Sequence, residues 1–344
     1  MRSPVWLVVL VGTLVAVILP VPSVRADVPA RAVVIVSGGD AISPFTAPDA
    51  ACATGLAAGN TDTGLRENLL SRNDIVYTSP AMAGRGPVVE QGGFGAFGDC
   101  PITLPENMTV DSTASIDLAG EHLARFVTFL HDTRNVGEVD FVAHSMGGLY
   151  SRAAIRVLQG VGSPVRIRSL TTIGTPWEGS FLNDYANGIT PLSDCLGDAF
   201  CQKSMRVMKD EVTRLMSGSG REVNQGYLMG PTGWNGYQAG VLDDIPVVLI
   251  GGARFTHAGP VNPMVWPNDG IVTRASALAT DVGDGVVPHR RCFAFDDTHS
   301  IFIADAAGLP WTDALTWDPH VFDVVREALD TADTALSQPN RVGC

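Results

Sequence analysis

The hydrophobic positions of this chain follow two alternating patterns. Short runs rich in β-branched residues predict strands at 33–36, 74–78, 139–142, 167–173, 245–250 and 291–295. Between 116 and 130 the apolar residues recur every three or four positions, which predicts a helix, and further helical patterns follow strand 139–142 through 159 and at 319–335. Nearly continuous apolar strands separated by helices indicate an α/β fold, in which helices cover both faces of a mainly parallel sheet.

Two stretches interrupt this alternation. Residues 79–113 are rich in Gly and Pro, and we interpret them as a long ordered loop held by a disulfide. Residues 178–240 are inserted between two strands and contain a predicted helix at 204–216. Insertions above the carboxyl edge of a sheet often form lids, although a surface excursion would give the same pattern. We therefore expect one catalytic domain over 27–344, with a cap over about 178–240.

The first 26 residues have the features of a secretory signal peptide. Arg2 precedes an apolar run from Val5 to Leu19, and Ala26 stands at a suitable cleavage point. The run is shorter than the roughly 20 residues that a membrane-spanning helix needs, but an uncleaved anchor helix remains the alternative. Cleavage near Ala26 predicts a secreted, extracellular protein. Without Arg2 and Arg25 the chain has 21 basic and 36 acidic side chains, which disfavours nucleic acid and anionic membrane surfaces as partners.

Six cysteines follow the predicted signal peptide, and an even number in an exported protein predicts three disulfides. Cys195 and Cys201 are close enough in sequence to join a local loop. For the others we expect Cys52–Cys100 and Cys292–Cys344, the second of which would hold the C-terminal tail. Sequence alone leaves other pairings open. The absence of a CxxC pair and of an accompanying His cluster disfavours a metal site at the cysteines.

The strongest chemical signal is Ala143-His144-Ser145-Met146-Gly147-Gly148, between a predicted strand and a predicted helix. A nucleophile elbow is a sharp turn that projects a serine above the sheet and needs small residues two positions to either side. Ala143 and Gly147 meet that requirement. The start of a helix directly after Ser145 also favours negative charge that develops in a reaction. We expect His144 to point away from the serine and to have a structural role.

The elbow resembles that of the bacterial secreted lipases and esterases of the α/β-hydrolase superfamily. Thr172–Ser180 and Asn268–Val272 resemble further segments of that group, although Trp177 stands where the group has His. The resemblance extends from residue 33 to about 303. It implies an α/β-hydrolase fold and a Ser-His-Asp triad, with the acid in the Asn268-Asp269-Gly270 turn.

In this fold the acid and then the histidine follow the serine along the chain. Asp269 follows strand 245–250, whereas Asp243 and Asp244 precede it, and Asp281 and Asp284 lie in a Gly-rich turn. Among the histidines, His257 precedes Asp269, His289 precedes the last strand and His320 begins a helix. His299 follows the last strand, at the edge where catalytic loops gather. Ser145, Asp269 and His299 are therefore the predicted triad.

Two backbone N–H groups are needed to bind an oxyanion. One is expected at Met146, directly after the nucleophile. Matching Ser37-Gly38 to the His-Gly pair of the resembled family places the other at Gly39, with Asp40 as the alternative. Asp296 and Asp297 make a structural calcium near the histidine conceivable, but their spacing does not indicate a ligand set. We predict no metal and no cofactor.

These residues predict a serine hydrolase that cleaves carboxylic esters through an acyl-enzyme, either a triacylglycerol lipase or an esterase. Trp177, the loop around Phe94 and Phe97, and the methionines of the cap helix (Met205, Met208, Met216) are candidates for an apolar acyl site. We expect a monomer that acts on a lipid or a small ester, with transient contact to a lipid interface. The alternatives are an extracellular acyltransferase or phospholipase, a peptidase or amidase, or a non-catalytic binding protein on the same scaffold.

Overall fold

The computed structural model describes residues 29–48, 60–88, 103–215, 218–337 and 341–344. Its main feature is a seven-stranded sheet in the order β2-β1-β5-β6-β7-β8-β9, with every neighbouring pair parallel. The strands are β1 (Ala30–Val36), β2 (Val76–Thr78), β5 (Val136–His144), β6 (Arg166–Ile173), β7 (Val247–Gly252), β8 (Arg290–Phe295) and β9 (Arg341–Val342). The six predicted strands are all present. The short β9 adds a seventh that hydrophobic periodicity did not indicate.

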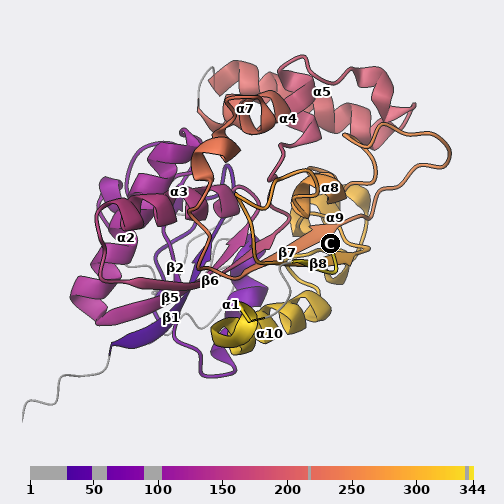
Figure 1. Cartoon of the computed structure of the whole chain (residues 1–344). Helices are drawn as coiled ribbons and strands as arrows, with labels where there is room; N and C mark the ends of the chain where they lie inside the picture. The colour runs from indigo at the N-terminus through magenta and orange to yellow at the C-terminus, as the bar shows by residue number, and fades with distance from the viewer. Residues whose placement is uncertain (1–28, 49–59, 89–102, 216–217, 338–340) are drawn as a thin grey trace, which may run out of the picture.

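Helices cover both faces of this sheet (Figure 1). The helices α2 (Ile116–Arg134) and α3 (Gly147–Gly160) lie on one face, and α1 (Thr63–Leu70) and α10 (Pro319–Ala335) lie on the other. Alternate residues of β1 explain the two layers, because Val34 and Val36 pack with α2 and α3 while Val33 and Ile35 pack with α1 and α10. Parallel strands buried on both sides in this order form the α/β-hydrolase fold, as predicted.

The helices begin and end where the sequence supplies capping groups. The Ser115 side chain accepts a hydrogen bond from Leu118 N–H at the start of α2, and Asn135 ends that helix in the left-handed conformation. The helix predicted at 204–216 is α5 (Ala199–Leu215), which begins earlier than expected. Asp198 explains the difference, because its carboxylate accepts the Cys201 N–H at 2.7 Å in the first turn of α5.

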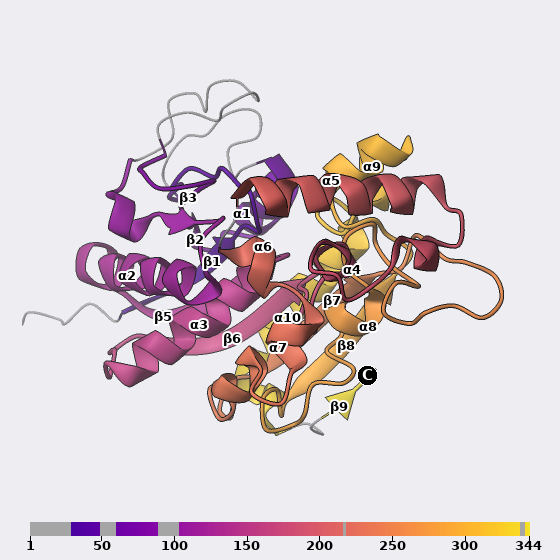
Figure 2. The same ribbon diagram turned by 90° about the horizontal axis from the view of Figure 1, so that it is seen from above.

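The segment between β6 and β7 forms a helical layer above the carboxyl edge of the sheet (Figure 1). Seen from above, α5 is its longest helix and crosses the molecule beside α4 (Figure 2). Its elements are α4 (Phe181–Ala186), η3 (Leu192–Cys195), α5, α6 (Ser219–Glu222), α7 (Gln225–Met229) and η4 (Trp234–Gln238). Phe181 and Met205 of this layer are buried in a separate small core, together with Trp266 from the loop after β7.

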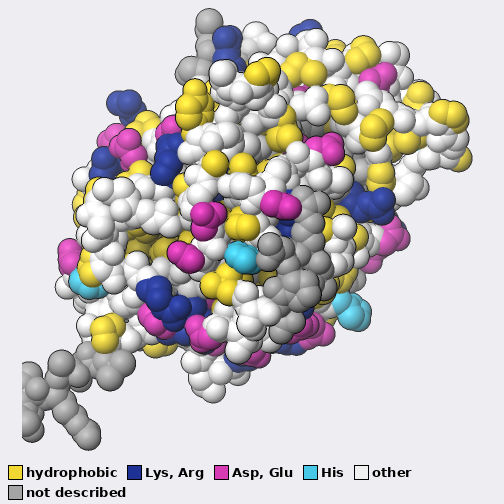
Figure 3. Space-filling model, in the orientation of Figure 1, with side chains coloured by type: hydrophobic (Ala, Val, Ile, Leu, Met, Phe, Trp, Pro, Cys, Tyr) yellow, Lys and Arg dark blue, Asp and Glu magenta, His cyan; other side chains and the backbone are white. Residues whose placement is uncertain are grey.

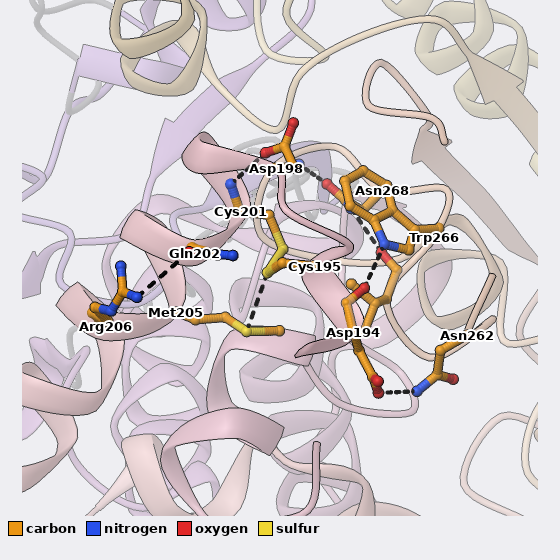
Figure 4. Close-up of a disulfide and its surroundings, with 12 residues drawn as sticks. Asp194, Cys195, Asp198, Cys201, Gln202, Met205, Arg206, Asn262, Trp266 and Asn268 are labelled. Carbon is orange, nitrogen blue, oxygen red and sulfur yellow. Dashed lines mark hydrogen bonds between the residues drawn. A yellow bond between two sulfur atoms is a disulfide. The ribbon is translucent and has the colours of Figure 1, made fainter. Parts of the chain in front are cut away.

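Beside a disulfide within this layer, two polar contacts fasten the layer to the loop after β7 (Figure 4). Cys195 and Cys201 are joined, as predicted. Beside them, the Trp266 indole N–H donates to the Asp194 carbonyl at 2.8 Å, and the Asn262 amide donates to the Asp194 carboxylate at 2.6 Å. The loop that contains Asn262 and Trp266 leads directly into Asn268 and Asp269. The helical layer is therefore attached to the segment in which the acid is predicted.

The other described parts are short connections and the C-terminal tail. Cys292–Cys344 is a disulfide, as predicted, and it holds the tail against β8. Cys52, Cys100 and the predicted signal peptide lie outside the described residues. The predicted loop at 79–113 contains, in its described part, a two-stranded parallel sheet and one turn of 3-10 helix. The remaining elements are β3 (Ala81–Met82), β4 (Val110–Asp111), η1 (Asn60–Asp62), η2 (Glu106–Met108), α8 (Arg274–Ala277), α9 (Ile301–Ala307) and η5 (Trp311–Asp313).

Charged side chains are spread over the face of the molecule that Figure 3 shows. On the face shown in Figure 3, acidic side chains are dispersed among apolar and basic ones. The full chain carries a net charge of −13. Within the described part of the chain, no helix combines the length and the apolar character that crossing a membrane requires.

Candidate active site

Ser145 occupies a sharp turn between β5 and α3. Its backbone is left-handed, with φ of 55°, a conformation that costs free energy for a residue with a side chain. The surrounding structure holds it there, because Ser145 N–H donates to the Ile173 carbonyl at 2.8 Å and Thr175 Oγ1 donates to the Ser145 carbonyl at 2.7 Å. A Cβ added to Gly147 would lie 2.3 Å from the Val36 carbonyl oxygen. The elbow therefore requires a small residue at Gly147.

The loop after β1 passes directly beside this turn. A Cβ added to Gly38 would lie 2.5 Å from Ser145 Cβ, and one added to Gly39 would lie 2.5 Å from Met146 Sδ. Ser37 fixes the start of the loop, because its hydroxyl donates to the Asp62 carboxylate at 2.5 Å and lies 2.7 Å from the Ser43 hydroxyl. Glycine at 38 and 39 thus lets the backbone of this loop approach the serine and the start of α3 closely.

Asp269 and His299 form a buried pair at the same edge of the sheet. His299 Nδ1 lies 2.8 Å from Asp269 Oδ2, and His299 N–H donates to the Asp269 carbonyl oxygen at 2.8 Å. Since a carboxylate only accepts, the Nδ1 of a neutral His299 carries the proton and Nε2 is left as a base. That Nε2 is buried and makes no hydrogen bond to any described residue.

The Asp269 carboxylate is held in place by its own loop. Its Oδ1 accepts hydrogen bonds from the N–H groups of Ile271 at 2.9 Å and Val272 at 2.7 Å, and the side chain is fully buried. Gly270 lies between these groups with φ of 103°, which glycine adopts readily. The Asn-Asp-Gly sequence therefore forms a tight turn and also aims the second carboxylate oxygen at His299.

His144 has the structural role that the sequence predicted. Its Nε2 donates to the His299 carbonyl at 3.0 Å, and the two rings lie 4.8 Å apart. Burial and then the neighbouring His299 lower the pKa of His144 to about 3, so its ring is neutral at pH 7. Asp62 lies on its other side, 3.9 Å from Nδ1, and burial raises the pKa of Asp62 to about 7. Asp62 had no distinguishing pattern in the sequence.

The rejected candidates lie away from the serine. His289 precedes β8 at the amino edge of the sheet, where its carbonyl accepts Val247 N–H. His320 is in the first turn of α10 and its side chain is 82% exposed. Asp243 and Asp244 are exposed before β7. These positions agree with the order argument that selected Asp269 and His299.

Two cavities meet at Ser145. The His299 cavity, of about 300 Å³, is lined by residues that include His299, Ser300, Phe302 and Ile42. The Met146 cavity, of about 160 Å³, is lined by residues that include Met146, Met208, Val212 and Val223. Gly39, Asp40, Ser145 and Ile271 line both. The serine thus lies between two compartments of unequal size.

Part of the predicted apolar acyl site is wrong. Trp177 lines neither cavity, because its ring is fully buried and stacks on the Arg152 guanidinium, 4.2 Å from it. Its indole N–H donates to Thr172 Oγ1 at 3.1 Å, which holds it in the core. Met205 is buried within the helical layer, and only Met208 of the two described methionines reaches a cavity. Phe94, Phe97 and Met216 lie outside the described residues.

Comparison with known proteins supports an ester hydrolase. Residues 102–193 match the model of a family described as "Putative serine esterase (DUF676)". This range contains Ser145 but neither Asp269 nor His299. The match supports a hydrolase that acts on esters. No curated protein matches the chain.

Several solved structures are similar in fold, at low sequence identity. The propeptide form of the Bacillus licheniformis lipase BlEst2 is 14% identical over 90% of this chain, with a TM-score of 0.48. This chain spans about half of that protein, 51%. The lin2722 product of Listeria innocua is 16% identical, covering 90% of this chain and 97% of that one, with a TM-score of 0.47. The Pyrococcus furiosus esterase Pf2001 is 14% identical, covering 88% and 82%, with a TM-score of 0.46.

Proposed function

We propose that this protein is a secreted carboxylic ester hydrolase with Ser145 as nucleophile, His299 as base and Asp269 as the acid that orients the histidine. The observation that carries the proposal is the buried Asp269–His299 hydrogen bond of 2.8 Å, on the rim of a cavity that Ser145 also lines. A serine is a weak nucleophile unless a histidine accepts its proton. The carboxylate then stabilises the imidazolium that forms.

The reaction proceeds in two steps. Ser145 Oγ attacks the ester carbonyl while His299 Nε2 takes its proton, and the imidazolium returns that proton to the leaving alcohol. Water, activated by the same histidine, then releases the acid from the acyl-enzyme. The oxyanion is held by the N–H groups of Met146 and Gly39. The close approach of the Gly38-Gly39 backbone to Ser145 and Met146 supports this second donor.

The layer between β6 and β7 is the cap of the site, since Met208, Val212 and Val223 of this layer line the Met146 cavity. Secretion rests on the N-terminal pattern of the sequence. The disulfides Cys195–Cys201 and Cys292–Cys344 are compatible with an oxidising compartment.

The test is hydrolysis of p-nitrophenyl butanoate by the oxidised protein and by Ser145→Ala. We expect the variant to lose at least 10³-fold in kcat/KM and to lose labelling by a fluorophosphonate. Ser163→Ala is the matched control, because Ser163 lies in the turn after α3, where its hydroxyl contacts Val165 N–H at 3.2 Å. Equal activity of Ser145→Ala and the wild type would refute the nucleophile. Preferential transfer of the acyl group to an added alcohol would instead identify an acyltransferase.

A further inference from the structure

The chemistry of the proposed triad assigns the two cavities to different parts of an ester. The tetrahedral carbon formed at Ser145 has three other substituents, which are the oxyanion, the alkoxy group and the acyl chain. The alkoxy oxygen must receive its proton from His299 Nε2 and therefore lies on the histidine side. His299 lines only the larger cavity, so the alcohol part of the substrate belongs there.

The acyl chain then lies in the compartment on the other side of the serine. Met146, whose N–H is one of the two proposed oxyanion donors, lines only this smaller cavity. Its volume of about 160 Å³ is close to that of the engineered cavity of about 150 Å³ that accommodates benzene. The space is therefore suited to an acyl chain of about four to six carbons.

The lining of this cavity also limits the chain length. Its lining combines apolar side chains, such as Met208, Val212 and Val223, with the polar side chains of Asn183, Glu211 and Asp40. Each methylene group contributes about 0.8 kcal/mol only where it is transferred onto apolar surface. A chain that outgrows the volume of about 160 Å³ would have no further apolar surface of this cavity to cover, and its additional methylene groups would gain little.

We infer that the preferred substrate of this site is an ester of a short acyl group with a larger alcohol, so that the protein is an esterase rather than a lipase for long-chain acylglycerols. The inference rests on the proposed function, because the assignment of the cavities follows from the triad. It adds two specificity-determining positions. Met208 limits the acyl group, and Phe302, in the larger cavity and 40% exposed, limits the alcohol.

Two substrate series test this inference on the full-length oxidised protein. The first varies the acyl chain of p-nitrophenyl esters from two to sixteen carbons. The second varies the alcohol of butanoate esters from methyl to naphthyl. We expect kcat/KM to peak at four to six acyl carbons, to fall at least tenfold by twelve, and to remain within threefold as the alcohol grows to naphthyl.

Matched variants separate the two compartments. Met208→Ala should move the acyl optimum to longer chains by two or more carbons and leave the ratio of naphthyl to methyl butanoate unchanged. Phe302→Ala should change that ratio at least threefold and leave the acyl optimum unchanged. Val207→Ala is the control for α5, because Val207 is 60% exposed and lines neither cavity. It should change neither profile.

The outcomes distinguish this inference from the proposed function. Faster hydrolysis of twelve- to sixteen-carbon esters, with dependence on Ser145, would overturn the inference and leave the hydrolase intact. An effect of Met208→Ala on the alcohol ratio rather than on the acyl optimum would also overturn it, because the two cavities would then be assigned in reverse. Failure of the folded protein to cleave any ester in either series would refute the proposed function itself.

Discussion

Replacing Asp269 by Asn isolates the role of one carboxylate oxygen. Asp269 Oδ1 accepts two backbone N–H groups, from Ile271 and Val272, and the carbonyl oxygen of Asn can accept the same two. The turn is therefore retained. The Asn amide, however, then presents a donor to His299 Nδ1 in place of the oxygen that lies 2.8 Å from it. His299 Nδ1 must become the acceptor, and the proton moves to Nε2.

With its proton on Nε2, His299 cannot take the proton of Ser145. The analogous Asp-to-Asn change in a serine protease triad lowers kcat by about 10⁴-fold with the geometry intact, or about 5 kcal/mol at 1.36 kcal/mol for each factor of ten. We expect a loss of the same order in this protein. The unfolding midpoint in urea should change little, because the burial and the backbone contacts of the side chain are preserved.

The assay is single-substrate kinetics with p-nitrophenyl butanoate, together with circular dichroism and urea unfolding. Asp244→Asn is the matched control, since Asp244 is exposed before β7 and lies at the opposite edge of the sheet. A well-folded Asp269→Asn protein that retains more than a tenth of the wild-type kcat would refute the assignment of Asp269. An equal loss in Asp244→Asn would show that the effect is not specific to the site.

Three further predictions concern stability, and urea unfolding measures each. Gly147→Ala should lower the free energy of unfolding by about 3 kcal/mol, because the added Cβ would overlap the Val36 carbonyl oxygen. Gly160→Ala, in the same helix, places its Cβ in open space and should change the free energy of unfolding by less than about 1 kcal/mol. Equal effects of the two substitutions would argue against the close packing of the turn at Ser145. Removing the Cys292–Cys344 disulfide should lower the free energy of unfolding by about 4 kcal/mol, and removing Cys195–Cys201 by about 2 kcal/mol. The reason is that the first disulfide closes a loop with a sequence separation of 52 and the second one of only 6, so the first restricts the unfolded chain more. A larger loss on removal of Cys195–Cys201 would contradict this. Burial raises the pKa of Asp62 from 3.8 to about 7, so between these values the native state holds a proton that the unfolded chain has released. The free energy of unfolding should therefore fall as the pH rises from 4 to 7. Asp62→Asn should reduce this pH dependence, and an unchanged dependence in the variant would refute the role of Asp62.

Much of the scaffold follows from local patterns along the chain. Runs such as Val33–Val36 predicted central strands because parallel strands are buried on both faces, and the spacing from Ile116 to Leu130 predicted the apolar side of α2. The small residues around Ser145 and the order of Ser145, Asp269 and His299 predicted a triad, and the structure brings Asp269 and His299 within 2.8 Å of each other beside a cavity that Ser145 also lines. β9 was missed, since two residues carry no periodicity and their pairing with Arg290 and Arg291 is set by the tail that Cys292–Cys344 holds.

The sequence by itself determined which residues are candidates for the chemistry of a hydrolase, and the tertiary structure decided what surrounds them. Trp177 illustrates the difference, because its position in a family-like motif suggested a pocket wall while its stacking on Arg152 places it in the core. Met205 and Met208 lie on one helix, yet only Met208 reaches the cavity beside the serine. Asp62 contacts the site from a distant segment of sequence. Local patterns report backbone conformation and chemical type, whereas cavity size and buried contacts depend on side chains that are brought together from separate parts of the chain.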